Sequence, residues 1–223
     1  MNQIKYYFST TQDGNLAYHV NDIKENVDKN REQLAQKVGY EAKKLVYMNQ
    51  VHGNNVQIVT KESSKLIDNC DGIITTEKNL PLMVMVADCI PILFFDEIKG
   101  VIAAVHAGRN STFQKIAQIT ANKMIEELDC QAQNIKVIMG PSIHACCYEV
   151  SDELLQIVKT TFGQEFCIGQ NIDLHKINIK LLEEVGINHI RVSEICTKCA
   201  DEPFYSFRKD KNTGRFAGVI IQN

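Results

Sequence analysis

The sequence lacks any run of about 20 apolar residues, the length that a helix needs to cross a bilayer. Its first stretch, MNQIKYYFSTTQDG, has no apolar core of the signal-peptide type. Neither sign of charge is in large excess, because 24 Lys and Arg stand against 27 Asp and Glu, for a formal net charge of −3. These absences argue against membrane and nucleic-acid partners, and we expect a cytoplasmic protein.

The two common glycine-rich phosphate-binding motifs, G-x-G-x-x-G and G-x-x-x-x-G-K-[ST], are also absent. There is no internal repeat and no low-complexity run, and the four prolines and twelve glycines mark turns rather than a linker. With 223 residues the chain is long enough for a sizeable core. We therefore expect one domain over residues 1–223.

Apolar patterning predicts a chain in which strands and helices are interleaved. Strands are expected at 4–10, in two pieces within 45–60, and at 71–76, 81–96, 101–108, 135–140, 189–194 and 215–222. Helical spacing predicts helices over 25–38, 111–130, 151–163 and 175–187. Because the order follows no strict βαβ rhythm, we expect an α/β (α+β) fold with a mixed sheet, or two sheets, and helices outside.

Eight cysteines are many for a chain expected to be cytoplasmic, and we interpret them as reduced thiols. Cys196 and Cys199 form a C-x-x-C motif, but no second ligand pair follows it, so a turn with two packed thiols is the favoured interpretation. Cys146 and Cys147 are adjacent, and neighbours in a strand point to opposite faces. They are therefore not expected to bind one ion together.

Polar residues interrupt the apolar strands at three places: His52, the pair Asp88–Cys89, and His106. Pro91 cannot donate to a strand ladder, so the sheet is expected to be interrupted or at an edge there. Two imidazoles and one thiolate suit zinc and would leave the fourth tetrahedral position open, as in a catalytic site. The alternative is that each is an ordinary core or surface residue.

The same residues allow a reading without a metal. Cys89 could be a nucleophile and His106 its base, with Asp88 or an Asn orienting the ring. Arg109, just before an expected helix, and Arg208, between aromatic residues, could bind an anion, or each could be a surface cation paired with an acid.

Five motifs in one order resemble the laccase-domain family, also called the multicopper polyphenol oxidase or YfiH-like purine nucleoside phosphorylase family. They are QVHGNNV, DGIITT followed by VADCIPILFFD, VHAG, GPSIHACCYEV and CTKCADEPFYSFRKDKNTGRFAGVI. The resemblance covers nearly the whole chain. It implies an α/β fold, a mixed β-sheet sandwich with flanking helices, which is grouped with cysteine hydrolases.

The resemblance also implies a site and an activity. The metal ligands of the family match His52, Cys89 and His106 here, with Zn²⁺ as the expected ion and copper possible. It implies phosphorolysis of adenosine, inosine and methylthioadenosine, and deamination of adenosine. Cys89, His106 and Asp88 are the expected catalytic residues, and purine nucleosides and phosphate the expected partners.

Arg208, Arg109 and Asn54 are expected to bind phosphate or substrate. The chain departs from the family pattern near one of these residues. The family continues H-A-G-W-R-G-T, whereas this chain reads HAGRNST, with Arg109 at the Trp position and Asn110 at the Arg position. The substrate preference is therefore open, as is the oligomeric state, monomer or homodimer.

Three other classes stay as alternatives. A cysteine hydrolase using Cys89 and His106 would act on an amide, such as a cell-wall precursor, without metal. A copper-dependent phenol oxidase of the multicopper type needs many histidines, and six His without an H-x-H pair make it the weaker alternative. A zinc-binding protein without catalysis is the third.

Overall fold

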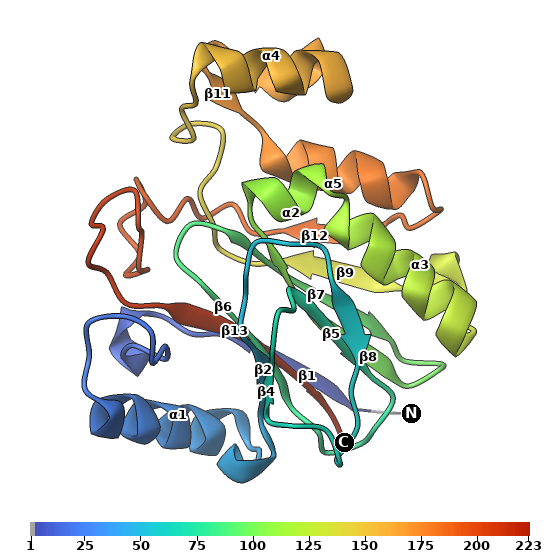
Figure 1. Cartoon of the computed structure of the whole chain (residues 1–223). Helices are drawn as coiled ribbons and strands as arrows, with labels where there is room; N and C mark the ends of the chain where they lie inside the picture. The colour runs from blue at the N-terminus through green and yellow to red at the C-terminus, as the bar shows by residue number, and fades with distance from the viewer. Residues whose placement is uncertain (1–2) are drawn as a thin grey trace.

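The computed structural model describes residues 3–223 as two sheets stacked face to face between helices (Figure 1). The first sheet has the strand order β1-β13-β6-β2-β4 and the second the order β12-β9-β7-β8-β5-β3. Both contain parallel and antiparallel pairs, so the sheets are mixed as expected. The first sheet comprises β1 (Ile4–Phe8), β13 (Phe216–Gln222), β6 (Leu82–Val86), β2 (Val46–Met48) and β4 (Leu66–Ile67). The second comprises β12 (His189–Val192), β9 (Lys136–Met139), β7 (Ile90–Asp96), β8 (Val101–Ala107), β5 (Gly72–Thr75) and β3 (Val56–Ile58).

Helices cover the outer faces of the two sheets (Figure 1). On the first sheet lies α1 (Lys24–Val38), which ends where Gly39 adopts a left-handed conformation with φ 86°. Over the second sheet lie α2 (Arg109–Phe113), α3 (Ile116–Leu128) and α5 (Leu174–Glu183), whereas α4 (Asp152–Thr161) lies beyond them, at the top of Figure 1. A two-stranded ribbon, β10 (Cys167–Ile168) with β11 (Asn171–Ile172), precedes α5.

The buried apolar residues form three layers of core that match this arrangement. One lies between α1 and the first sheet, one between the two sheets, and one between the second sheet and its helices. The central strands β7 and β8 are buried along their whole length, because both of their faces are covered. This confirms the expectation, drawn from their continuous apolar runs, of a strand buried on both faces.

Two expected elements differ in detail. The single helix predicted over 111–130 is two helices, because Lys115 adopts a left-handed conformation with φ 62° between α2 and α3. The break lets the short α2 lie against α5, where Asn178 Nδ2 donates to the buried Thr112 hydroxyl at 3.0 Å.

The apolar run 81–96 is the second difference, because it forms two strands rather than one. The first half is β6 in one sheet and the second half is β7 in the other, so the chain crosses between the sheets at Ala87–Cys89. Asp88 sits in this crossover with φ 87°, a backbone conformation that few side chains adopt. Pro91 lies next to the start of β7, where it pairs with His106 of β8.

Candidate functional site

The position of His106 follows from the alternation of β8. Ile102 and Ala104 face the layer between the sheets, whereas Val101 and Val105 face the helices. Since side chains alternate along a strand, His106 continues the row of Ile102 and Ala104 and points between the sheets. It is 3% exposed, so its polar ring nitrogens need partners there.

Asp71, just before β5, is the partner of His106. Its Oδ1 lies 2.8 Å from His106 Nδ1, and Asp71 itself is fully buried. The carboxylate also accepts the backbone N–H groups of Val51, His52 and Gly53 at 3.1, 3.0 and 2.8 Å. Burial opposes the charge, but the bonds from His106 and these amides lower the pKa of Asp71 below its usual value.

The loop that Asp71 holds carries His52, whose φ of 59° is unusual for a residue other than glycine. Gln50 anchors the same loop to β6, because its side-chain amide donates to the Met85 carbonyl at 2.7 Å and accepts from the Met85 N–H at 2.9 Å. His52 is therefore fixed from both sides of the loop.

These elements bring His52, Cys89 and His106 together. One donor atom from each lies within 4.8 Å of the others, and Cys89 Sγ is 4.0 Å from His52 Nε2. Because Asp71 engages His106 Nδ1, the Nε2 atom is left for a metal, as in carboxylate–histidine–metal arrangements. The three donors fit a borderline-soft ion such as zinc, with a fourth position open.

Gly108 lies close against the side chains of the candidate ligands. A Cβ at this position would lie 3.0 Å from Cys89 Sγ and 3.0 Å from His52 Cδ2. A side chain at this position would therefore press on Cys89 and His52. The three candidate ligands of the sequence analysis thus form one cluster that fits a metal.

In the protein without metal, Cys89 and His106 form a charged pair. Burial by itself would raise the pKa of Cys89, but the charge and hydrogen bond of His106, helped by His52, lower this pKa to about 6. Burial likewise disfavours the imidazolium, but Cys89 and Asp71 raise the pKa of His106 to about 9. The pair is therefore a thiolate and an imidazolium near neutral pH.

Asp88 is buried beside the cluster, and other groups occupy its carboxylate. Oδ1 accepts from the Thr197 hydroxyl at 2.7 Å and Oδ2 from the Arg208 backbone N–H at 2.6 Å. The Asp88 carbonyl accepts from the Ile143 N–H at 2.9 Å. Through these hydrogen bonds Asp88 connects the crossover that carries Cys89 to two loops, one around residue 143 and one over residues 197–208.

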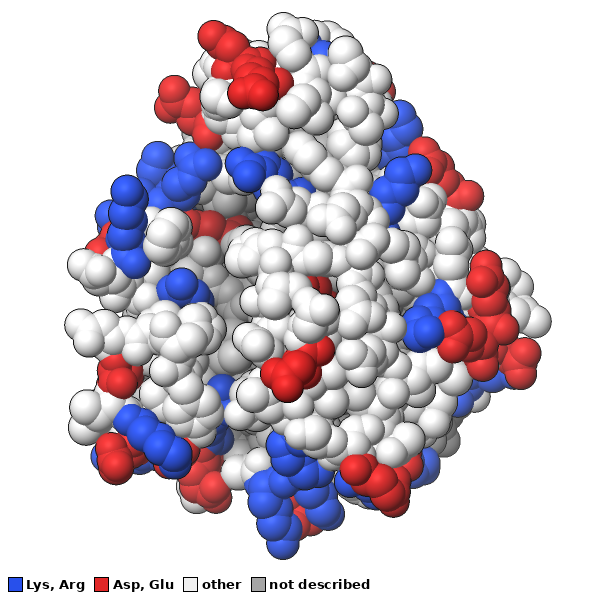
Figure 2. Space-filling model, viewed as in Figure 1, with Lys and Arg blue, Asp and Glu red and all other residues white. Residues whose placement is uncertain are grey.

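A cavity of about 290 Å³ opens at the cluster. His52, Cys89 and His106 form one wall, and Tyr148, Phe207, Arg208 and Arg215 come from the C-terminal half of the chain. Figure 2 shows a hollow to the left of centre, with basic side chains along its upper rim.

A second hollow of about 600 Å³ shares Arg208 with this cavity and is lined by Arg109 as well. The Arg208 guanidinium lies over the Tyr148 ring, 4.8 Å from its centroid, and donates to the Glu149 carbonyl at 3.1 Å. The two expected anion-binding arginines thus line one hollow, which adjoins the cavity at the His52–Cys89–His106 cluster. Asn54 is exposed, donates to the Gln114 carbonyl at 3.4 Å, and lies outside the lining of both hollows.

Sequence reasoning missed several residues of the site, above all Asp71. A signal existed, because Asp71 is an acid directly before a buried strand, in CDGIITT. No comparable sequence pattern singles out the other missed residues, which are Gln50, Tyr148, Phe207 and Arg215. The expectation that the adjacent Cys146 and Cys147 point apart was also wrong, because both sulfurs lie within 4.8 Å of those of Cys196 and Cys199.

A family model described as multi-copper polyphenol oxidoreductase laccase matches residues 6–223. The chain belongs to this family. Among curated relatives, a purine nucleoside phosphorylase of Mycobacterium tuberculosis is 34% identical over 210 residues, covering 92% of this chain and 83% of the relative. A purine nucleoside phosphorylase of Clostridium acetobutylicum is 33% identical over 222 residues, covering 97% and 91%.

Solved structures agree with this assignment. The hypothetical protein YfiH of Bacillus licheniformis superimposes with a TM-score of 0.92 at 26% identity, covering 98% of this chain and 92% of that one. YlmD of Geobacillus stearothermophilus superimposes with a TM-score of 0.86 at 30% identity, covering 94% and 84%. The expected family and fold class are confirmed.

Two further findings bear on the membrane and multicopper alternatives. Within residues 3–223, no helix combines the length and the apolar character that a membrane span requires. Over the same residues, the candidate metal clusters are the His52–Cys89–His106 group and the four-cysteine group. Neither has the several histidines that a trinuclear copper centre needs.

Proposed function

We propose that the protein is a zinc-dependent purine nucleoside phosphorylase that also deaminates adenosine. The substrates are adenosine, inosine and methylthioadenosine. The observation that carries this proposal is the cluster of His52, Cys89 and His106 in a cavity flanked by Arg208. The relatives named purine nucleoside phosphorylase support it.

His52, Cys89 and His106 would hold the metal. Bound zinc supplies Lewis acidity and a lowered pKa for coordinated water. Copper also accepts two imidazoles and a thiolate, so the donor set supports zinc without excluding copper. Asp71 would fix the tautomer of His106 and keep its Nε2 directed at the ion.

Phosphorolysis needs a site for phosphate beside the ribose. In this step a phosphate oxygen bonds to C1′ while the C1′–N9 bond breaks, and the purine leaves as the free base after taking up a proton. Arg208, on the cavity wall, would bind the phosphate, and Arg109 in the adjoining hollow would add a second positive charge.

The nucleoside would occupy the cavity of about 290 Å³, together with part of the adjoining hollow. Pockets for such ligands range from about 300 to 1,000 Å³. Tyr148 and Phe207 offer aromatic surface for a purine. Asp88 is assigned a positioning role, because its two oxygens already hold Thr197 and Arg208.

Product analysis tests this proposal. The purified protein is incubated with adenosine with and without phosphate, products are separated by chromatography, and metal is measured on the same sample. We expect adenine only with phosphate, inosine without it, and loss of both in Cys89→Ala. A zinc-loaded wild-type protein that forms neither adenine nor inosine would contradict it.

One observation favours a second candidate, a cysteine hydrolase acting on an amide. The Cys89 thiolate, the His106 imidazolium and the Asp71 carboxylate form the charge arrangement of a cysteine nucleophile with an oriented base. Amide hydrolysis that survives chelation and is abolished by alkylation of Cys89 would favour this candidate. Nucleoside turnover that is abolished by chelation would favour the phosphorylase.

A further inference from the structure

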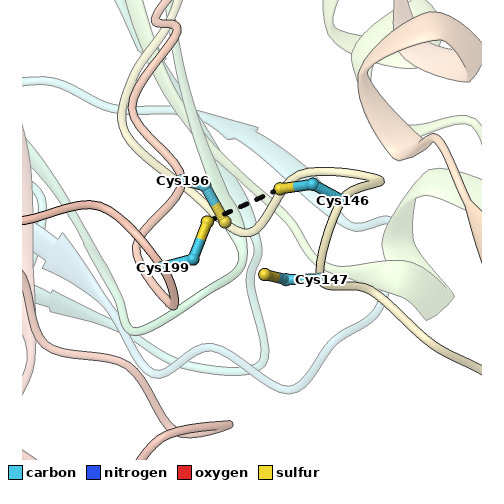
Figure 3. Close-up of side chains that lie close together, drawn as sticks. All are labelled: Cys146, Cys147, Cys196 and Cys199. Carbon is cyan, nitrogen blue, oxygen red and sulfur yellow. Dashed lines mark hydrogen bonds between the residues drawn. The ribbon is translucent and has the colours of Figure 1, made fainter.

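Four cysteine side chains from two loops converge on one point at the surface (Figure 3). Cys146 and Cys147 come from the loop between β9 and α4, and Cys196 and Cys199 from the loop after β12. We call them the loop cysteines. None of them belongs to the His52–Cys89–His106 cluster, and the proposed activity gives them no part.

The local backbone explains how adjacent cysteines share one centre. Residues Ala145–Cys147 form a turn, in which the N–H groups of Cys147 and Tyr148 both bond to the His144 carbonyl, at 2.9 and 3.0 Å. The strand alternation that would separate Cys146 from Cys147 therefore does not apply. In Figure 3 both thiols point toward Cys196 and Cys199.

The spacing of the sulfurs fits a single ion. All four lie within 4.8 Å of one another, and Cys146 Sγ is 3.7 Å from Cys199 Sγ. A tetrahedral ion with Zn–S bonds of about 2.3 Å separates its sulfurs by about 3.8 Å. A disulfide requires an S–S distance of about 2.0 Å. An iron–sulfur cluster places its cysteine sulfurs around several iron atoms, and so farther apart than the sulfurs are here.

The surroundings also suit thiolate ligands. The backbone N–H of His144 donates to Cys196 Sγ at 3.5 Å, the kind of outer bond that supports metal-bound sulfur. Cys196 is buried while Cys146 and Cys199 are exposed, so an ion can reach the site from solvent. Apolar packing does not account for exposed thiols that all face one point.

We propose that Cys146, Cys147, Cys196 and Cys199 bind a second zinc ion as a structural tetrathiolate site. Binding releases the four thiol protons and closes the coordination shell, so this ion has no open position for substrate. The site is thus distinct in chemistry from the three-ligand cluster.

This ion would stabilise the walls of the active cavity. One of its loops continues directly from Cys147 into Tyr148, which lines the cavity. The other contains Thr197, whose hydroxyl bonds to Asp88, the neighbour of Cys89. The direct backbone connection between the loops is short, a bridge of Ser142 with Cys196, so the metal would be their main cross-link.

Metal counting on variants of the full chain tests the proposal. The protein is purified with reductant and zinc, and bound zinc per chain is measured by elemental analysis and native mass spectrometry. We expect two zinc ions in the wild type, and one each in Cys89→Ala and in Cys146→Ser/Cys199→Ser. The matched control is Cys167→Ser, a half-exposed cysteine outside both clusters, which should keep two.

Cobalt substitution identifies the ligands. Cys89→Ala loaded with Co²⁺ should show the strong sulfur-to-metal charge transfer of a tetrathiolate. Because this variant keeps all four loop cysteines, it tests the site even if the serine variants fail to fold. A Cys89→Ala chain that binds no Co²⁺ or Zn²⁺ would overturn the proposal. A native mass two hydrogens short, with a Cys146–Cys199 disulfide in the reductant-treated wild type, would overturn it as well.

Discussion

Asp71 Oδ1 lies 2.8 Å from His106 Nδ1, and this contact decides which ring nitrogen faces the cavity. The same carboxylate fixes the backbone of the His52 loop through three N–H groups. One buried acid therefore positions two of the three candidate metal ligands, although it contacts no ion itself.

Asp71→Asn tests this relationship. An amide is neutral and can offer only one acceptor oxygen, so it cannot serve His106 and the loop amides equally. We expect zinc affinity at the three-ligand site to fall about 10- to 100-fold, the usual effect of losing such a partner. Competition with a chromophoric chelator measures it. The control is Asp68→Asn, an exposed acid nearby, and equal affinities in the two variants would refute the assignment.

The second prediction concerns the pH dependence of Cys89 alkylation in metal-stripped protein. The thiolate is the nucleophile, and the pKa of Cys89 is lowered to about 6. Its reaction rate with iodoacetamide should therefore be level from pH 9 to about pH 7 and fall as the pH drops through about 6. Peptide mapping gives the rate at each cysteine.

Cys167 supplies the internal reference in the same experiment. Burial raises the pKa of this thiol above its usual value, so its rate should still be rising at pH 9. Identical profiles for Cys89 and Cys167 would contradict the thiolate–imidazolium pair. Replacing His106 with Gln should move the Cys89 inflection to higher pH.

Gly108→Ala forms the third prediction. Its Cβ would meet Cys89 Sγ and His52 Cδ2 at 3.0 Å, so the ligands must move apart. We expect at least a tenfold loss of zinc affinity and of activity, with little change in the unfolding temperature.

Gly53→Ala is the matched control for Gly108→Ala. It adds the same methyl group to the His52 loop, but its Cβ would have ordinary contacts at 3.6 Å. Equal zinc affinities in the two variants would show that the space beside Gly108 does not serve a metal.

Arg208→Gln tests the phosphate site. The backbone N–H of residue 208 can still bond to Asp88, so the change removes the guanidinium and leaves the loop attached. A charge-assisted hydrogen bond contributes about 1.5–3 kcal/mol, and KM for phosphate should rise about tenfold or more. Deamination of adenosine, which uses no phosphate, should change less.

Lys209→Gln controls for the loss of one positive charge, because Lys209 is the exposed neighbour of Arg208. Initial rates at varied phosphate concentration separate KM from kcat. An unchanged KM for phosphate in Arg208→Gln would mean that Arg208 is an ordinary surface cation.

Much of the framework could be predicted from apolar periodicity alone. The buried runs became strands, and α1 ends at Gly39 as expected. His52, Cys89 and His106 were recognisable because each is a polar residue where a strand should be apolar. Their convergence was an expectation from the resemblance, since more than fifty residues separate the first ligand from the last along the chain.

Features that depend on the backbone conformation of single residues could not be predicted from the sequence. The split of 81–96 into two sheets rests on the positive φ of Asp88, and the helix break rests on that of Lys115. Cys146 and Cys147 approach Cys196 and Cys199 because of a turn that the sequence pattern does not predict. Asp71 was missed because its role lies entirely in contacts with residues distant along the chain.

The placement of β13 has a consequence for biosynthesis. β13 is the last strand in chain order among those described, yet it lies inside the first sheet, between β1 and β6. β1 and β6 therefore cannot complete their pairing until the ribosome has synthesised the residues that lie between β6 and the end of β13. The crossover bearing Cys89 follows β6 directly, so the three-ligand site should acquire its metal only after β13 has been synthesised.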